Sequence, residues 1–179
     1  MNRILVAAAL SAIAACSTSE QEPRSTEPGD APPSGASLKA ADGADAGLVT
    51  LSEDGNGVTI KIEAAGLQPG DHGLHLHTVG RCDGPKFESA GPHWNPTGKQ
   101  HGRDNPAGAH LGDLANLNVA ADGRGMTSFT VSGATLKGAQ NPLIDLDGAA
   151  LVVHAKADDY KTDPSGSSGD RIACAILAD

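Results

Sequence analysis

The sequence predicts an all-β domain that carries two long functional loops. Val58, Ile60 and Ile62 alternate with polar residues directly after the turn signal at residues 54–57, as expected for a half-buried strand. No segment has sustained helical periodicity over three turns. The 23 glycines and 11 prolines of the 179-residue chain favour turns over long helices. An all-β fold is therefore the expected class.

Further candidate strands are separated by turn signals such as Pro69-Gly70 and Asp122-Gly123. They cover residues 47–51, 72–78, 114–120, 126–131, 151–155 and 171–177. Residues 79–113 and 156–170 are instead dense in Gly, Pro, Asp and Ser, which predicts two long loops. Long loops on a compact all-β body usually carry function.

The charge balance argues against a nucleic-acid partner. The chain has 13 Lys and Arg against 22 Asp and Glu, a net charge of -9, whereas nucleic-acid binding requires a concentrated basic surface. Its aromatic residues are few: Phe87, Trp94, Phe129 and Tyr160. So small a set offers no stacking platform for bases.

The first 15 residues are predicted to be a signal peptide. Arg3 precedes an apolar run at residues 4–15, which is shorter than the roughly 20 residues of a membrane-spanning helix. The run ends in Ile13-Ala-Ala-Cys16, which resembles the lipobox of bacterial lipoproteins and implies a lipid on Cys16. An ordinary cleaved signal with Cys16 as a bystander is the alternative. In either case we expect export. The lipobox interpretation implies a periplasmic lipoprotein, and Ser17 favours an anchor in the outer membrane.

Residues 16–37 are predicted to be the lipidated Cys and a flexible tether. The stretch 17–37 is rich in Ser, Pro, Glu and Gly and has no aliphatic residue larger than Ala, so it cannot bury enough surface to order itself. The folded domain is then expected at residues 38–179, a size that suits one domain.

Two cysteines remain in that domain, Cys82 and Cys174. An even pair in an oxidising compartment predicts a disulfide. Two free buried thiols are the alternative.

The chain contains seven histidines, most of them in or beside the two loops, at positions 72, 75, 77, 93, 101, 110 and 154. His75 and His77 lie two positions apart in a predicted strand, so both side chains project from one face and both can reach one metal. Two unrelated surface histidines are the alternative for this pair.

The loop residues His93, His101, His110 and Asp113 offer three nitrogens and one carboxylate. That set fills a tetrahedral zinc shell and leaves no open position, as in a structural site. A His-rich solvated loop is the alternative. The remaining donors, His75, His77 and His154, suit copper, which accepts all-imidazole ligation and exists in two oxidation states.

Five stretches, in order along the domain, carry these residues. They are Gly73-Leu-His-Leu-His77, Ser89-Ala-Gly-Pro-His-Trp-Asn-Pro96, His110-Leu-Gly-Asp-Leu114, Leu151-Val-Val-His-Ala-Lys-Ala-Asp-Asp159 and Gly169-Asp-Arg-Ile-Ala-Cys174. Together they resemble the copper,zinc superoxide dismutase family in its bacterial periplasmic branch. The resemblance implies an eight-stranded Greek-key β-barrel or sandwich, with which the turn-rich alternating sequence is compatible.

The resemblance also implies roles for individual residues. Copper would be held by His75, His77, His93 and His154, and zinc by His93, His101, His110 and Asp113. His93 would bridge the two metals and take part in catalysis by releasing copper and accepting a proton. Asp158 would accept hydrogen bonds from His75 and His101 and fix their tautomers. Arg171 would bind the anionic substrate beside the copper. His72 and Trp94 would be structural.

The implied activity is dismutation of superoxide to dioxygen and hydrogen peroxide, as a defence against superoxide outside the cytoplasm. Lys86 and Lys161 are candidates for steering the anion, whereas Glu88 would oppose it. A non-enzymatic copper and zinc carrier of the same fold is the main alternative, although storage alone needs neither Arg171 nor a bridging His93. A zinc hydrolase needs an open zinc position for an activated water, and three His plus one Asp leave none. A surface adhesin would leave the histidines unexplained. Monomer and homodimer both stay open.

Overall fold

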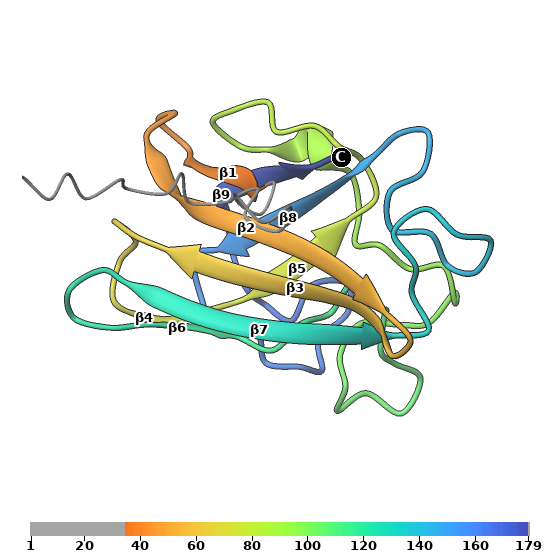
Figure 1. Cartoon of the computed structure of the whole chain (residues 1–179). Coiled ribbons are helices and arrows are strands. Elements are labelled where there is room, and N and C mark those ends of the chain that lie inside the picture. Colours follow the sequence, from red (N-terminus) through yellow and green to blue (C-terminus); the bar gives the residue numbers. More distant parts are fainter. Residues whose placement is uncertain (1–34, 179) are drawn as a thin grey trace, which may run out of the picture. The chain divides into compact units, whose positions relative to one another are not determined.

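A computed structural model describes residues 35–178, and its strands form two antiparallel sheets (Figure 1). The larger sheet has seven strands in the order β5-β8-β9-β1-β2-β3-β7, and β4 pairs with β6 in the smaller one. The strands are β1 (Gly35–Ala40), β2 (Asp45–Asp54), β3 (Gly57–Ala64), β4 (Gly70–His72), β5 (Leu74–His77), β6 (Leu117–Val119), β7 (Gly125–Ser132), β8 (Ala149–His154) and β9 (Arg171–Leu177). The short 3-10 helix η1 spans Glu88–Ala90.

The two edges of the large sheet are linked through the small one. β6 lies against β7 at one edge, and its partner β4 leads through Gly73 into β5 at the other edge. The sheet therefore curls back on itself, and the all-β prediction is confirmed. Taking β4 and β5 as one strand interrupted at Gly73 gives the eight strands that the resemblance implied.

Several strand limits differ from the predicted ones. β1 was not predicted, because Leu38 is its only large apolar residue; it forms by pairing with β2 and β9. It begins three residues before the expected start of the domain at Leu38. The predicted strand at 114–120 shrinks to β6, since the backbone N–H of Asn116 donates to the hydroxyl oxygen of Tyr160 instead of to a ladder partner. The signal peptide, Cys16 and residues 17–34 of the tether lie outside the described residues.

The core fills the interior of the curled sheet with alternating apolar side chains. Ile60 and Ile62 of β3 are fully buried, as their period-two spacing predicts. On β5, Leu74 and Leu76 join the same core and pair with Val153 and Leu151 of β8. The intervening histidines of β5 must then point to the opposite face, yet they are fully buried as well. Something outside the barrel covers them.

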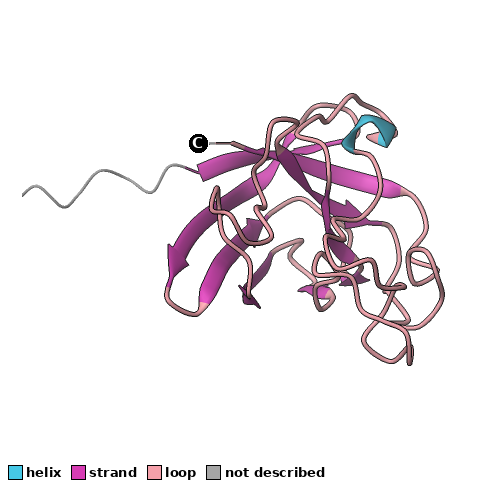
Figure 2. Ribbon diagram, turned by 90° about the vertical axis from the view of Figure 1, so that its right-hand side faces the viewer, coloured by secondary structure: helices cyan, strands magenta, loops and turns pink. Residues whose placement is uncertain are grey.

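The cover consists of the long loops, which lie mostly on one side of the domain (Figure 2). The segment between β5 and β6 and the segment between β8 and β9 match the loops predicted at 79–113 and 156–170, apart from η1. None of the helical structure within residues 35–178 is long and apolar enough to cross a bilayer.

Candidate metal centre

All seven predicted metal-binding residues lie in one region, where the loops meet the outer face of β5. The donor atoms of His75, His77, His93 and His154 all lie within 4.8 Å of one another. A second group, with the same limit, consists of His75, His93, His101 and Asp113. His75 and His93 belong to both groups and therefore lie where the two groups meet.

β5 acts as the backbone template of this region. His75 and His77 point away from the core as Leu74 and Leu76 point into it. The loops then pair with β5 through isolated bridges, His75 with Asp113 and His77 with His93. Two donors separated by 20 residues in sequence are thus fixed beside the two strand histidines.

The fourth member of the first group comes from β8. A β-bulge between Val153 and His154 shifts the register with β9, so that Val153 faces Ala173 whereas His154 faces Arg171. Bulges of this kind redirect side chains at the edges of functional sites. Here the bulge places Arg171 opposite His154, a histidine of the first group.

Three histidines of the first group each use one ring nitrogen and leave the other without a partner. His75 Nε2 lies 2.8 Å from Asp158 Oδ2, His77 Nδ1 lies 2.8 Å from Gly91 O, and His154 Nδ1 lies 3.1 Å from Gly169 O. Each acceptor fixes the N–H on the nitrogen that faces it. The buried nitrogens left without a hydrogen bond are His75 Nδ1, His77 Nε2 and His154 Nε2.

Unpaired buried nitrogens are costly unless something binds them. Here they belong to one group of mutually close donor atoms, and each has a lone pair because its ring carries the proton on the other nitrogen. The arrangement fits a metal ion that accepts imidazole nitrogen, such as copper.

The second half of the site is organised around Asp113. Its Oδ1 lies 3.0 Å from the Nδ1 atoms of His93, His101 and His110. Its Oδ2 accepts hydrogen bonds from the backbone N–H groups of Gly102 and His110, which hold the carboxylate in place. Four donors around a tetrahedral zinc ion at 2.0–2.1 Å are roughly 3.3 Å apart, so these contacts fit zinc.

His75 and His110 differ in how they take part in this second half. His75 is close enough to be counted with it, but its Nε2 already faces Asp158 and its Nδ1 belongs to the first group. His110 lies outside the tight second group, yet its Nδ1 touches Asp113 Oδ1 as closely as the other two imidazoles do. The local chemistry therefore favours His110 over His75 as the donor here.

Asp158 connects the two halves. Its Oδ2 lies 2.8 Å from His75 Nε2 and its Oδ1 lies 3.0 Å from His101 Nε2. The carboxylate is fully buried, and Gly166 packs directly against it with a positive φ of 65°, where a Cβ atom would collide with Oδ1. One buried carboxylate thus orients one imidazole of each half.

Burial dominates the electrostatics of the first group. Loss of solvent lowers the pKa of His75 to about 3, of His77 to about 2 and of His154 to about 4. Burial also lowers the pKa of His93. These imidazoles are neutral at physiological pH, which is the form that binds metal.

The second half behaves in the opposite way. Burial alone would lower the pKa of His101, but hydrogen bonds to Asp113 and Asp158 outweigh it and raise the pKa to about 9. Burial would raise the pKa of both aspartates, and their hydrogen bonds to histidines hold it well below the usual range instead. His101 faces a carboxylate through each ring nitrogen. Such a cluster calls for a cation, either a proton or a metal.

Arg171 lies beside the first group. Its Nη1 donates to Phe87 O at 2.7 Å and its Nη2 donates to Gly91 O at 2.8 Å, the same carbonyl that accepts from His77. It is half-buried and lines a cavity of about 500 Å³ together with Lys86 and Glu88. Burial lowers the pKa of Arg171, but a guanidinium stays charged at any working pH.

The candidate steering residues are solvated. Lys86 Nζ lies 3.9 Å from Glu88 Oε1, and both side chains are 80% exposed. Lys161 is exposed as well. Glu88 therefore offsets part of the charge of Lys86 at the cavity that Arg171 lines.

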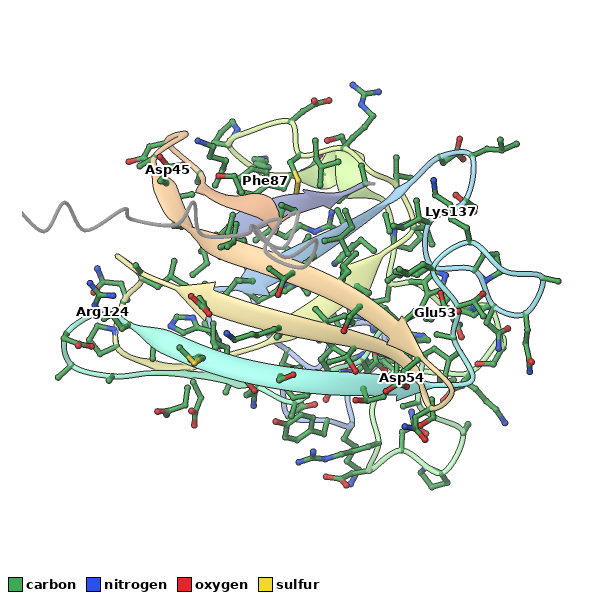
Figure 3. The ribbon with its side chains drawn as sticks, viewed as in Figure 1. Asp45, Glu53, Asp54, Phe87, Arg124 and Lys137 are labelled. Atoms are coloured by element: carbon green, nitrogen blue, oxygen red, sulfur yellow. A yellow bond between two sulfur atoms is a disulfide. The ribbon has the colours of Figure 1, made fainter. Side chains whose placement is uncertain are left out.

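The predicted disulfide is confirmed: Cys82 and Cys174 are joined, with 92 positions between them. It pins the loop after β5 to β9. Beneath the loop, Phe87 packs with Ala150, Val152 and Cys174 in a small second core, near the yellow sulfur atoms in Figure 3. This second core buries part of the outer face of β8 and β9.

His72 and Trp94, which were expected to have structural roles, are both buried. His72 is buried with its ring nitrogens 2.7 Å and 2.8 Å from the carbonyl oxygens of His154 and Gln68, so neither is free to bind metal. Trp94 is 6% exposed and packs in the main core.

Sequence reasoning missed three loop residues. Asn116 makes two hydrogen bonds to the main chain of Asp158. Tyr160 donates its backbone N–H to Asp158 Oδ1 at 2.6 Å, and Asp163 Oδ1 accepts from the backbone N–H of His101 at 2.7 Å. The contacts of Asn116 and Asp163 span 42 and 62 positions and leave no local pattern in the sequence, whereas that of Tyr160 to Asp158 spans only two.

The chain is similar in sequence and in structure to known proteins. Residues 45–177 match the family described as copper/zinc superoxide dismutase. The superoxide dismutase [Cu-Zn] of Caulobacter vibrioides is 44% identical over 143 residues, covering 78% of this chain and 82% of the relative. The crystal structure of a SOD-like protein from Bacillus subtilis matches with a TM-score of 0.76 and 42% identity, over 80% of this chain and 97% of that one. The Cu/Zn superoxide dismutase from Brucella abortus matches with a TM-score of 0.62 and 28% identity, over 80% and 98%.

Proposed function

The chain belongs to the copper/zinc superoxide dismutase family, and from that premise we propose how its residues divide the work between two metals. It is a superoxide dismutase that converts superoxide to dioxygen and hydrogen peroxide, with copper and zinc as cofactors. The assignment of each donor, and of the catalytic residues, is our proposal.

Copper is held by His75, His77, His93 and His154. The observation that carries this assignment is the set of three buried lone-pair nitrogens on His75, His77 and His154, which have no other partner. Their depressed pKa values keep protons from competing for the same nitrogens.

Zinc is held by His93, His101, His110 and Asp113. Support comes from the three equal contacts that Asp113 Oδ1 makes with imidazole nitrogens. His93 serves both metals, since its Nδ1 faces Asp113 and its other nitrogen is left for the first group.

Copper, when bound, supplies the one-electron oxidation and reduction of superoxide, whereas zinc adds positive charge without redox chemistry. The protein supplies the geometry around that chemistry. His93 is the residue that holds and gives up a proton, at Nε2, because its Nδ1 is engaged with Asp113. A proton released from this nitrogen would be available to the peroxide product.

Arg171 binds the superoxide anion. Two of its five donor hydrogens are used by Phe87 O and Gly91 O, which fixes the guanidinium plane and leaves the others for an anion. Because the chain carries a net charge of -9, a local positive group is needed to attract the substrate.

The test is superoxide decay, measured by pulse radiolysis on the purified mature protein with its metal content assayed alongside. We expect one copper and one zinc per chain and rapid, copper-dependent decay. His93→Ala should lose most of this activity. If one copper and one zinc bind per chain but decay stays at the rate of free buffer, a carrier role of the same fold replaces the proposed mechanism.

We also propose that the enzyme works in the periplasm as a lipoprotein. Residues 1–15 serve as the signal peptide, Cys16 carries the lipid, and the tether up to residue 37 links it to the domain. Support comes from the apolar run and the lipobox-like end at Cys16. Fractionation tests the idea: the protein should sediment with outer membranes, and Cys16→Ser should release it. Recovery of both proteins in the soluble fraction would contradict the anchor. The proposed partners are superoxide and the membrane that holds the lipid anchor.

Light scattering decides between a monomer and a homodimer.

A further inference from the structure

We propose that Tyr160 is a positioning residue for the zinc half of the site. It connects the loop between β8 and β9 to the segment between β5 and β6, called here the zinc-side loop because it carries His93, His101, His110 and Asp113. The connection thereby fixes the imidazole of His101. This inference rests on the zinc ligands proposed above and adds a residue that touches neither metal nor substrate.

Four parts of Tyr160 are engaged at once. Its backbone N–H donates to Asp158 Oδ1 at 2.6 Å, the oxygen that also faces His101 Nε2. Its backbone carbonyl accepts from the N–H of Asp104 at 2.9 Å. Its hydroxyl oxygen accepts from the N–H of Asn116 at 2.8 Å. Its ring lies under the guanidinium of Arg103, with the Cζ atom 3.7 Å from the ring centroid.

The backbone of Tyr160 is held in an unfavourable conformation. Its φ is 59°, in the left-handed region that bulky residues rarely adopt. Such a conformation persists only where the surroundings over-determine it. The four contacts of Tyr160 supply that constraint.

The contacts converge on one short segment of the zinc-side loop. Gly102, Arg103 and Asp104 follow the zinc-side residue His101 directly. Gly102 packs so closely that a Cβ atom would collide with the carbonyl oxygen of Tyr160, and its N–H donates to Asp113 Oδ2 at 2.9 Å. Tyr160 therefore packs against the segment that follows His101 and that donates a hydrogen bond to Asp113.

Asn116, at the far end of the zinc-side loop, contacts both Tyr160 and Asp158. Its side chain exchanges two hydrogen bonds with the main chain of Asp158, at 2.8 Å and 3.0 Å. The hydroxyl of Tyr160 fixes its backbone. Asp158 is thus held from both sides, and the orientation of its carboxylate depends on Tyr160 as well as on the two histidines it contacts.

These contacts predict graded effects on zinc retention. Arg103 is exposed, and a cation–π contact at an exposed position corresponds to about a two- to fivefold effect. Tyr160→Leu removes the ring and the hydroxyl, and groups that orient metal ligands change affinity by about tenfold or more. Tyr160→Phe keeps the ring and should have a smaller effect than Tyr160→Leu.

The experiment measures zinc release from the holoenzyme into a chromophoric chelator, together with the visible spectrum after cobalt replaces zinc. The variants are Tyr160→Phe, Tyr160→Leu, Arg103→Gln and the two double variants. Arg124→Gln, in the turn before β7, is the matched control for loss of an arginine (Figure 3). We expect Arg103→Gln to speed release in the wild type and when combined with Tyr160→Phe, and to have no effect when combined with Tyr160→Leu. The cobalt bands should shift in Tyr160→Leu and stay in place in Arg124→Gln.

Two results would separate the failures. If the wild-type protein takes up no zinc, the zinc site itself is wrong and the role of Tyr160 goes with it. If the wild-type protein holds one zinc, but Tyr160→Leu releases it at the wild-type rate with unchanged cobalt bands, only the role of Tyr160 is overturned. A lower melting temperature with both readouts unchanged would mean a merely structural contact and would overturn it too.

Discussion

Arg171 is the cross-strand partner of His154, because the register between β8 and β9 skips Ile172 at the bulge. The side chain of Arg171 and that of His77 also share one acceptor, the carbonyl oxygen of Gly91. The cation that we propose binds the substrate is therefore connected to His154 and His77, two of the proposed copper ligands, through the backbone. Because the guanidinium donates to backbone carbonyls and to none of the imidazoles, the role of Arg171 can be tested separately from metal binding.

Arg171→Ala should reduce the second-order rate of superoxide decay by about tenfold or more, since a positive group in a cleft raises the local concentration of an anion. Arg171→Lys should lie in between, because an ammonium keeps the charge but cannot reproduce the planar contacts to Phe87 O and Gly91 O. Pulse radiolysis at several salt concentrations measures both, with Arg124→Ala as the control. Loss of copper from Arg171→Ala would show instead that the residue acts on the site and not on the substrate.

Asp158→Asn should weaken both metals at once. An amide cannot accept from His75 and His101 on both sides, because one side now presents an NH2 group to an imidazole N–H. We expect affinity for zinc and for copper to fall by about 10- to 100-fold, as measured by competition with chelators. The exposed Asp71→Asn in β4 is the control. Unchanged affinity for either metal would contradict the bridging role.

The metal-free protein should lose stability as the pH falls from 7 to 5. The folded-state pKa values of His75, His77 and His154 lie at about 3, 2 and 4, below the ordinary value near 6.5. The unfolded chain therefore binds more protons in this range, and stability present above pH 6.5 is lost below it. By linkage each histidine accounts for roughly 2 kcal/mol of the decrease.

His101 acts against this trend. Its pKa is raised to about 9. Its contribution to the free energy of unfolding is therefore fully present below pH 6.5 and is lost as the pH rises through 9. Between pH 7 and 5 it adds back only roughly 1 kcal/mol. Urea unfolding of the metal-free protein at the two pH values gives the net change. Equal or greater stability at pH 5 would show that the three histidines are not neutral when folded.

The double variant Cys82→Ser with Cys174→Ser should be less stable than the wild type. The bridge closes a loop of 92 positions, for which the chain-entropy model gives about 4 to 5 kcal/mol. Denaturant midpoints of the variant and of the reduced wild type should agree, since both lack the same bond. Midpoints that match the oxidised protein would mean that the second core around Phe87 holds the loop unaided.

The sequence allowed prediction of those parts of the fold and the site that follow from local pattern. The alternation at Val58, Ile60 and Ile62 predicted β3, and the spacing of His75 and His77 predicted two donors on one face. The pairing of Cys82 with Cys174 followed from export and an even count. The fold class, the family and the two metals are confirmed.

Other features depend on contacts far apart in the chain. β1 has almost no apolar pattern and is defined by its neighbours. The bulge that sets Arg171 opposite His154 exists only once β8 and β9 have paired. The hydrogen bonds of Asn116 to Tyr160 and to Asp158 form only once the two loops have come together. The individual ligand assignments, of which the shared role of His93 came from the resemblance alone, stay predictions, as do the lipid on Cys16 and the signal peptide.

The two halves of the site differ in what carries them. His75, His77 and His154 are part of the hydrogen-bonded ladder of β5 and β8, whereas His101, His110 and Asp113 come from a loop with little regular structure. Amide protons in the first half should therefore exchange with solvent as slowly as those of the barrel whether or not metal is present. Those in the loop are protected only as far as zinc and its neighbours hold it closed. We therefore expect zinc, the metal without redox chemistry, to govern how often this side of the protein opens.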